Sequence, residues 1–112
     1  MSSFYQIGVD GGGTKTECIL VDAAGEIVGR HLAPGSNPSV VGAEQARLIV
    51  TDALCALRAQ IPATSQPLVT ATQLYMAGNR AFWREVGAGL LEFGTVTVAD
   101  DSLPVLELAT NG

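Results

Sequence analysis

Basic side chains, cysteines and long apolar runs are scarce in these 112 residues, and each shortage excludes a class of protein. The six lysines and arginines are scattered and outnumbered by eleven acidic residues, so no basic patch is available to bind nucleic acid. The two cysteines, Cys18 and Cys55, lack CxxC spacing, which indicates buried thiols in a reducing, cytoplasmic setting. No apolar run reaches the roughly 18 residues of a membrane span, and residues 1–10 lack signal-peptide features, so we expect no membrane association.

With these classes of protein excluded, the sequence suits one α/β domain, since 47% of its residues are hydrophobic and 15% are charged. Alternation of apolar and polar residues predicts strands at residues 5–9, 16–22 and 27–33. Gly25 lies in a tight turn between the second and third of these strands, so the three form an antiparallel meander. Residues 34–39, PGSNPS, are predicted to be loop.

The second half alternates helices and strands. Between Gly42 and about Ile61, apolar residues recur at helical spacing, which predicts a helix with one buried face, namely Ala46, Ile49, Val50, Ala53, Leu54 and Leu57. A strand at 73–78, an amphipathic helix at 79–93, a strand at 95–101 and a helix from 102 follow. The order βββαβαβα predicts an α/β architecture with helices packed on a mixed sheet and crossover connections between the later strands.

Three consecutive glycines, Gly11, Gly12 and Gly13, separate the first two predicted strands in IGVDGGGTKTECILVD. They do not form a Walker A loop, because counting from Gly8 places Thr14 where the lysine is required. They do not form a dinucleotide-binding G-x-G-x-x-G motif either, because Thr16 stands where the last glycine is required. Both motifs also precede a helix, whereas here a strand follows.

A glycine-rich hairpin can bind phosphate in another way, because backbone N–H groups without Cβ atoms around them can point at one anion. Thr14 would add a hydroxyl and Lys15 a positive charge, while Asp10 at the end of the strand suits magnesium. The alternative is an ordinary type I′ or II′ hairpin, which needs only one or two glycines. We therefore predict a phosphate-binding hairpin.

The stretch GVDGGGTKTECILVDAAGEIVG resembles the first phosphate motif of the actin, sugar-kinase and heat-shock-chaperone ATPase superfamily. Within it, the sequence is most similar to the BadF/BadG/BcrA/BcrD ATPase family, which includes N-acetylglucosamine kinases and glucosamine kinases. Ser36-Asn37 resembles the Ser/Thr-Asn pair of the family's next loop, and LYMAGNRAFWREV resembles its strand, Ala-Gly and helix. VTVADD resembles its closing Asn-Asp or Thr-Asp pair, although Asp100 replaces the usual Asn or Thr. The resemblance covers essentially the whole chain and implies a ribonuclease H-like (actin-like ATPase) fold.

The resemblance also implies roles for single residues. Asp101 matches the general base, Asp10 the magnesium-associated aspartate, and Ser36 and Asn37 the sugar-binding pair. The ATP phosphates are implied to lie against the hairpin residues Gly11, Gly12, Gly13, Thr14 and Lys15. Two alternatives stay open, since Asp101 could instead cap the helix that follows and Asn37 could be an ordinary turn residue. Asp100 beside Asp101 would raise the pKa of both carboxyl groups unless the two side chains point apart.

Kinases of this superfamily have two lobes, and the adenosine site lies in the C-terminal one. We therefore expect residues 1–112 to be an N-terminal lobe without kinase turnover of its own, with exposed surfaces that favour self-association, for example as a homodimer. The main functional prediction is the N-terminal lobe of an ATP-dependent amino-sugar kinase. An ATPase lobe of a 2-hydroxyacyl-CoA dehydratase or benzoyl-CoA reductase activator is the second, and the lack of a suitable cysteine pair argues against it. A non-catalytic sugar sensor is the third, and Asp101 argues against it.

Overall fold

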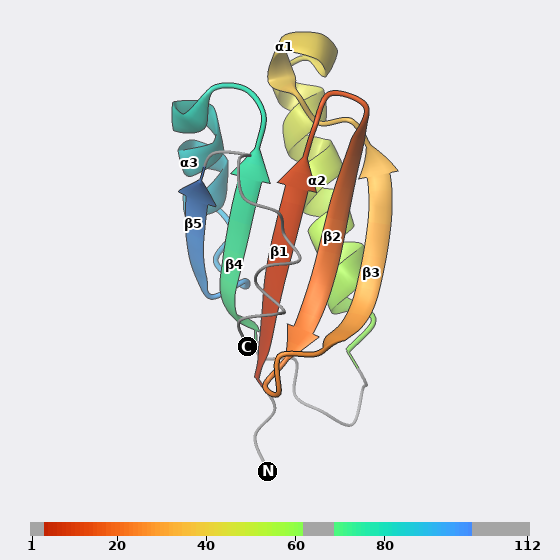
Figure 1. Cartoon of the computed structure of the whole chain (residues 1–112). Coiled ribbons are helices and arrows are strands. Elements are labelled where there is room, and N and C mark those ends of the chain that lie inside the picture. Colours follow the sequence, from red (N-terminus) through yellow and green to blue (C-terminus); the bar gives the residue numbers. More distant parts are fainter. Residues whose placement is uncertain (1–3, 62–68, 100–112) are drawn as a thin grey trace.

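The computed structural model describes residues 4–61 and 69–99, which form a five-stranded mixed sheet and the helices that connect it (Figure 1). The sheet order is β3-β2-β1-β4-β5, with bounds β1 (Tyr5–Gly11), β2 (Lys15–Asp22), β3 (Ile27–Pro34), β4 (Val69–Met76) and β5 (Thr95–Ala99). The first three strands are antiparallel, and β4 runs parallel to both β1 and β5. The predicted α/β class and N-terminal meander are confirmed.

Two helices, α2 (Ala43–Arg58) and α3 (Arg80–Ala88), cover one face of this sheet (Figure 1). Alternate residues of the strands point toward them, so Val9, Leu20 and Leu74 join the same buried cluster as Trp83 of α3. The buried residues of α2 are those predicted from the helical spacing: Ala46, Ile49, Val50, Ala53, Leu54 and Leu57. No helix within the described ranges is long and apolar enough to cross a membrane.

Several boundaries differ from the predicted ones, and residues 34–39 were wrongly predicted to be entirely loop. A short helix, α1 (Pro38–Val41), begins there because the Asn37 side chain accepts a hydrogen bond from the Ser39 N–H (2.9 Å) and proline suits the first helical position. β4 begins at Val69, earlier than predicted. The apolar–polar alternation that predicts a strand was weak here because Thr72, a polar residue, faces the core. Its hydroxyl donates there to the Phe93 carbonyl (2.9 Å).

The C-terminal predictions are tested only in part. α3 ends at Ala88 and α2 at Arg58, whereas the sequence predicted that these helices would reach residues 93 and about 61. β5 confirms the strand from residue 95. Residues 100–112, which include the rest of that strand and the helix predicted from 102, lie outside the described residues.

Cys18 is expected to resist alkylation in the folded protein, whereas Cys55 is expected to react. Cys18 is fully buried on β2, and burial, together with the neighbouring Glu17, raises the pKa of its thiol from 9.0 to about 12. Cys55 is exposed on α2, so the prediction of two buried thiols is confirmed for Cys18 and wrong for Cys55. Because the thiolate is the nucleophile, iodoacetamide at pH 8 should label one cysteine in native protein and both after denaturation. Native labelling of Cys18 would contradict the described packing.

The raised pKa of Cys18 also predicts a pH dependence of stability. Below pH 9 the thiol is protonated in both states, so it makes no pH-dependent contribution. Between pH 9 and about 12 the unfolded chain loses this proton and the folded chain keeps it, so the free energy of unfolding falls as the pH rises. Urea unfolding at pH 8 and 10.5 should show a smaller loss in Cys18→Ala than in the unchanged protein.

Candidate phosphate and sugar site

Three connecting segments meet at the end of the sheet where the C-terminal ends of β1 and β4 lie (Figure 1). They are the β1–β2 hairpin tip (residues 12–14), the segment before α1 (residues 35–37) and the turn between β4 and α3 (residues 77–79). The Ser36 N–H donates to the Gly12 carbonyl (3.1 Å), and the Ala77 N–H donates to the Gly11 carbonyl (2.8 Å). The carboxyl ends of neighbouring parallel strands are where open α/β sheets bind ligands.

The hairpin tip is neither a type I′ nor a type II′ turn, which was the alternative explanation for its glycines. The Gly12 N–H donates to the Lys15 carbonyl (2.9 Å), which closes the tip around Gly13 and Thr14. Neither of these central residues has a positive φ, whereas type I′ and II′ turns require one. The glycines of this tip therefore do not serve a left-handed bend, and their presence needs another explanation.

Close packing explains one of the three glycines, and open space explains another. A Cβ at Gly11 would lie 2.7 Å from Ser36 Oγ and 2.8 Å from Met76 Sδ, so a side chain there would displace the Ser36 hydroxyl and the end of Met76. A Cβ at Gly13 would meet nothing within 4 Å. The absence of side chains at Gly13 therefore leaves the backbone at the tip open to an approaching group.

Hydrogen-bond donors for an anion gather at the exposed tip. Within the described ranges, the N–H groups of Gly13 and Thr14 have no acceptor, and both residues are exposed together with Lys15. Two adjacent backbone donors, a hydroxyl and an ammonium group are suitable for a phosphate. The Gly12 N–H is used within the hairpin, so Gly11 and Gly12 shape the site while residues 13–15 offer its donors.

Asp10 lies on the sheet face opposite α2 and α3. Its cross-strand neighbours are Glu17 on β2 and Tyr75 on β4, and the residue is half-buried and already has an interaction partner. In the described part of the chain, no three His, Cys, Asp or Glu side chains gather to hold a metal. A single carboxylate beside a phosphate site fits magnesium, which binds through few carboxylates, substrate phosphates and water.

The predicted sugar-binding pair occupies two different environments. Ser36 is fully buried, with its Oγ 2.7 Å from Thr16 Oγ1. Asn37 is half-buried, and its Oδ1 caps α1, which leaves the Nδ2 amide as the group that can donate to a ligand. Gly78, with φ +102, packs on this segment, since a Cβ there would lie 2.9 Å from Pro38 Cδ and 3.2 Å from Asn37 Oδ1.

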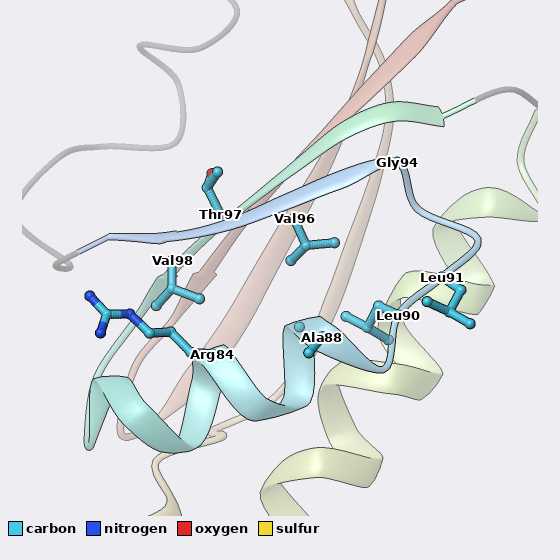
Figure 2. A pocket seen from close by; sticks show the side chains of 9 residues that line it. Arg84, Ala88, Leu90, Leu91, Gly94, Val96, Thr97 and Val98 are labelled. Atoms are coloured by element: carbon cyan, nitrogen blue, oxygen red, sulfur yellow. The ribbon is translucent and has the colours of Figure 1, made fainter.

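A separate groove of about 530 Å³ lies between α3 and β5, away from the hairpin (Figure 2). Figure 2 shows Val96, Val98 and Leu90 pointing into the space between helix and strand, whereas Thr97 points to the other side of the strand. Arg84 is the one ionisable side chain among its described lining residues. The groove therefore lacks the combination of acids, bases and anion donors that a catalytic site needs.

The model of the BadF/BadG/BcrA/BcrD ATPase family matches residues 7–73, which include the hairpin, Ser36 and Asn37. The chain belongs to this family. N-acetyl-D-glucosamine kinase from Dictyostelium discoideum is 41% identical over 54 residues, which are 48% of this chain and 17% of that protein. A solved structure from Chromobacterium violaceum, assigned as an N-acetylglucosamine kinase, matches with a TM-score of 0.63 and 27% identity. That match covers 86% of this chain and 34% of the other, so the chain spans about a third or less of these relatives.

For this member of the BadF/BadG/BcrA/BcrD family, the structure places the hairpin residues and the pair Ser36-Asn37 at one edge, whereas Asp100 and Asp101 lie outside the described residues. It also adds contributors that the sequence reasoning did not select: Thr16, Gly35 and Gly78. Thr16 could have been found from the sequence, because it is a polar residue at a position of β2 that faces the core. The two glycines could not, because their role depends on which loops meet.

Gly35→Ala is expected to destabilise the protein by about 1–3 kcal/mol, because it overpacks the loop contact at the site. A Cβ at Gly35 would lie 2.6 Å from the Gly13 carbonyl carbon and 3.0 Å from the Thr14 nitrogen, and backbone atoms cannot rotate away. Gly13→Ala is the matched control, since its Cβ meets nothing within 4 Å. Urea unfolding should separate the two variants, and equal midpoints would show that these loops are not in contact.

Proposed function

We propose that this chain is the phosphate-binding lobe of an ATP-dependent amino-sugar kinase, which transfers the γ-phosphoryl group of ATP to a hydroxyl of N-acetylglucosamine or glucosamine. The observation that carries the proposal is the direct contact between the glycine hairpin, which has donors for a phosphate, and the segment of Asn37, which has a donor for a sugar. Gly13 and Thr14, two exposed residues whose N–H groups have no acceptor in the described part of the chain, lie on the hairpin that packs against the segment carrying Asn37. The two N-acetylglucosamine kinases similar to this chain support the choice of substrate.

The hairpin would bind the β- and γ-phosphates of ATP. The Gly13 and Thr14 N–H groups, the Thr14 hydroxyl and the Lys15 ammonium group would neutralise and orient phosphate oxygens. Asp10 would hold a magnesium ion, which supplies further neutralisation of phosphate charge when bound. Phosphoryl transfer requires little covalent chemistry from a protein, so positioning and electrostatic stabilisation account for most of the catalysis.

The acceptor sugar would lie beside Asn37, whose Nδ2 donates to a sugar hydroxyl. In the transfer, the acceptor oxygen forms a bond to the γ-phosphorus, the bond from that phosphorus to the β–γ bridging oxygen breaks, and ADP leaves. Asp101, carried over from the family resemblance, would take the proton of the acceptor hydroxyl. The adenosine site would come from a second lobe, so residues 1–112 alone are expected to show no kinase turnover. A cytoplasmic location is part of the same proposal.

ADP release by the natural full-length protein that contains this segment tests the proposal. The reactions would contain magnesium, ATP and either glucosamine, N-acetylglucosamine, glucose or no sugar. An amino sugar is expected to raise the rate of ADP release at least tenfold over the reaction without sugar, because water is a poorly positioned acceptor. ADP release that is equally fast without sugar would favour a reductase or dehydratase activator, and sugar binding without ADP release would favour a sensor.

A further inference from the structure

Two hydroxyl groups lie buried between the glycine hairpin and the sugar-binding segment. Thr16 is at the start of β2, Ser36 is just before α1, and both are fully buried. Thr16 Oγ1 lies 2.7 Å from Ser36 Oγ and 2.9 Å from the Pro34 carbonyl oxygen. The pair joins residues that are 20 positions apart in the sequence.

The direction of these hydrogen bonds follows from the donor inventory. A carbonyl oxygen only accepts, so the single Thr16 hydroxyl hydrogen goes to Pro34, and the Ser36 hydroxyl must then donate to Thr16 Oγ1. The Ser36 N–H adds a third bond, to the Gly12 carbonyl (3.1 Å). Both side chains are therefore used within the protein, and neither is exposed to a sugar.

We propose that Thr16 and Ser36 form a hydroxyl latch, which holds Asn37 in register with the phosphate donors Gly13 and Thr14. The inference rests on the proposed function and assigns Ser36 a positioning role in place of direct sugar contact. Asn37 directly follows Ser36, and Thr14 lies two residues before Thr16, so the latch joins the acceptor side to the phosphate side through side chains close to both.

Removal of the Thr16 hydroxyl should disturb this register. In Thr16→Val the side chain keeps its shape, but the buried Ser36 hydroxyl loses its acceptor and the Pro34 carbonyl loses its donor. The segment carrying Asn37 then moves relative to the hairpin. Since transfer needs the acceptor oxygen aligned with the γ-phosphorus, the expected loss is in kcat more than in the affinity for ATP.

Thr72 provides a matched control in the same sheet. It is also fully buried, and its hydroxyl donates to the Phe93 carbonyl at 2.9 Å. It pairs with Ile7 in the middle of the β1–β4 register, away from the hairpin tip. Thr72→Val therefore removes a buried hydroxyl–carbonyl bond of the same kind without touching the latch.

The test compares Thr16→Val, Ser36→Ala, the double variant and Thr72→Val in the natural full-length protein. Thr16→Val should lower kcat with the amino sugar about tenfold while changing the Kd for ATP by less than about threefold, and Thr16→Ser should restore kcat. The double variant should lose no more than about what the more affected single variant loses, because the two hydroxyls act as one unit. Thr72→Val should change kcat less than about twofold.

Amide hydrogen exchange at Ser36 provides a readout that does not require activity. Thr16→Val should accelerate exchange at this amide at least tenfold, and Thr72→Val should not. An unchanged Ser36 amide, or equal losses of kcat in Thr16→Val and Thr72→Val, would overturn the latch. If the unchanged protein phosphorylates no sugar, the proposed function fails, and the exchange at Ser36 still decides whether the two hydroxyls hold the loops together.

Discussion

Asp101→Asn is expected to lower kcat for sugar phosphorylation by a factor of about 10²–10⁴, the usual contribution of a positioned general base. The asparagine amide has almost the same shape as the carboxylate but cannot take the proton of the acceptor hydroxyl. ATP binding should be retained, because the proposed phosphate donors are on the hairpin at Gly13, Thr14 and Lys15. Single-turnover kinetics with the full-length protein would separate the chemical step from binding.

Asp100→Asn is the matched control for this experiment, since it removes the same charge from the neighbouring residue. The kcat of Asp100→Asn is expected to stay within about threefold of that of the unchanged protein. Asp100 takes no proton in the proposed transfer, so only a weak electrostatic effect of its charge is lost. The alternative role of Asp101 as a helix cap predicts a different result: kcat is preserved in Asp101→Asn, because asparagine caps a helix as well as aspartate, and about 1 kcal/mol of stability is lost only in Asp101→Ala. That result would remove Asp101 from the proposed mechanism.

Trp83→Ala is expected to lower the free energy of unfolding by about 3–5 kcal/mol, the range for large aromatic residues in cores. Trp83 is fully buried on α3 and packs edge-on against Phe82, with ring centroids 4.8 Å apart. Its Nε1–H donates to the Ala77 carbonyl (3.0 Å), and the Ala77 N–H donates to the Gly11 carbonyl (2.8 Å). The side chain therefore supports both the core and the turn beside the hairpin.

Trp83→Phe separates these two contributions. It keeps most of the aromatic volume but leaves the Ala77 carbonyl without its donor, so a smaller loss of about 1–2 kcal/mol is expected. Urea unfolding monitored by far-UV circular dichroism would measure both variants, because the tryptophan fluorescence is lost with the substitution. A loss below about 1 kcal/mol in Trp83→Ala would contradict the burial described for α3.

The sheet and the main helix could be predicted because their signals are local. The alternation along residues 16–22 and the turn at Gly25 specify a hairpin, and the spacing from Ala46 to Leu57 specifies one buried helix face. The Asn37-Pro38 pair also carried a local signal, a capping residue followed by proline, which predicts a helix start as readily as a loop.

The contacts that form the site could not be predicted in the same way. The requirement for glycine at Gly35 and Gly78 arises because each backbone meets another loop, and those loops are distant in the sequence. The burial of Ser36 likewise depends on Thr16, which lies on a different element. The family resemblance suggested which residues belong to the proposed site, whereas only the folded chain shows that Ser36 faces Thr16.

Simultaneous quantification of ADP and phosphorylated sugar tests the central claim most directly. The natural full-length protein would be incubated with magnesium, ATP and N-acetylglucosamine or glucosamine, and both products would be measured by mass spectrometry over time. The proposed kinase predicts one phosphorylated sugar for each ADP formed, as the balance of phosphoryl transfer requires. ADP formation without any phosphorylated sugar would contradict the proposal and show that this edge of the sheet serves ATP hydrolysis coupled to another process.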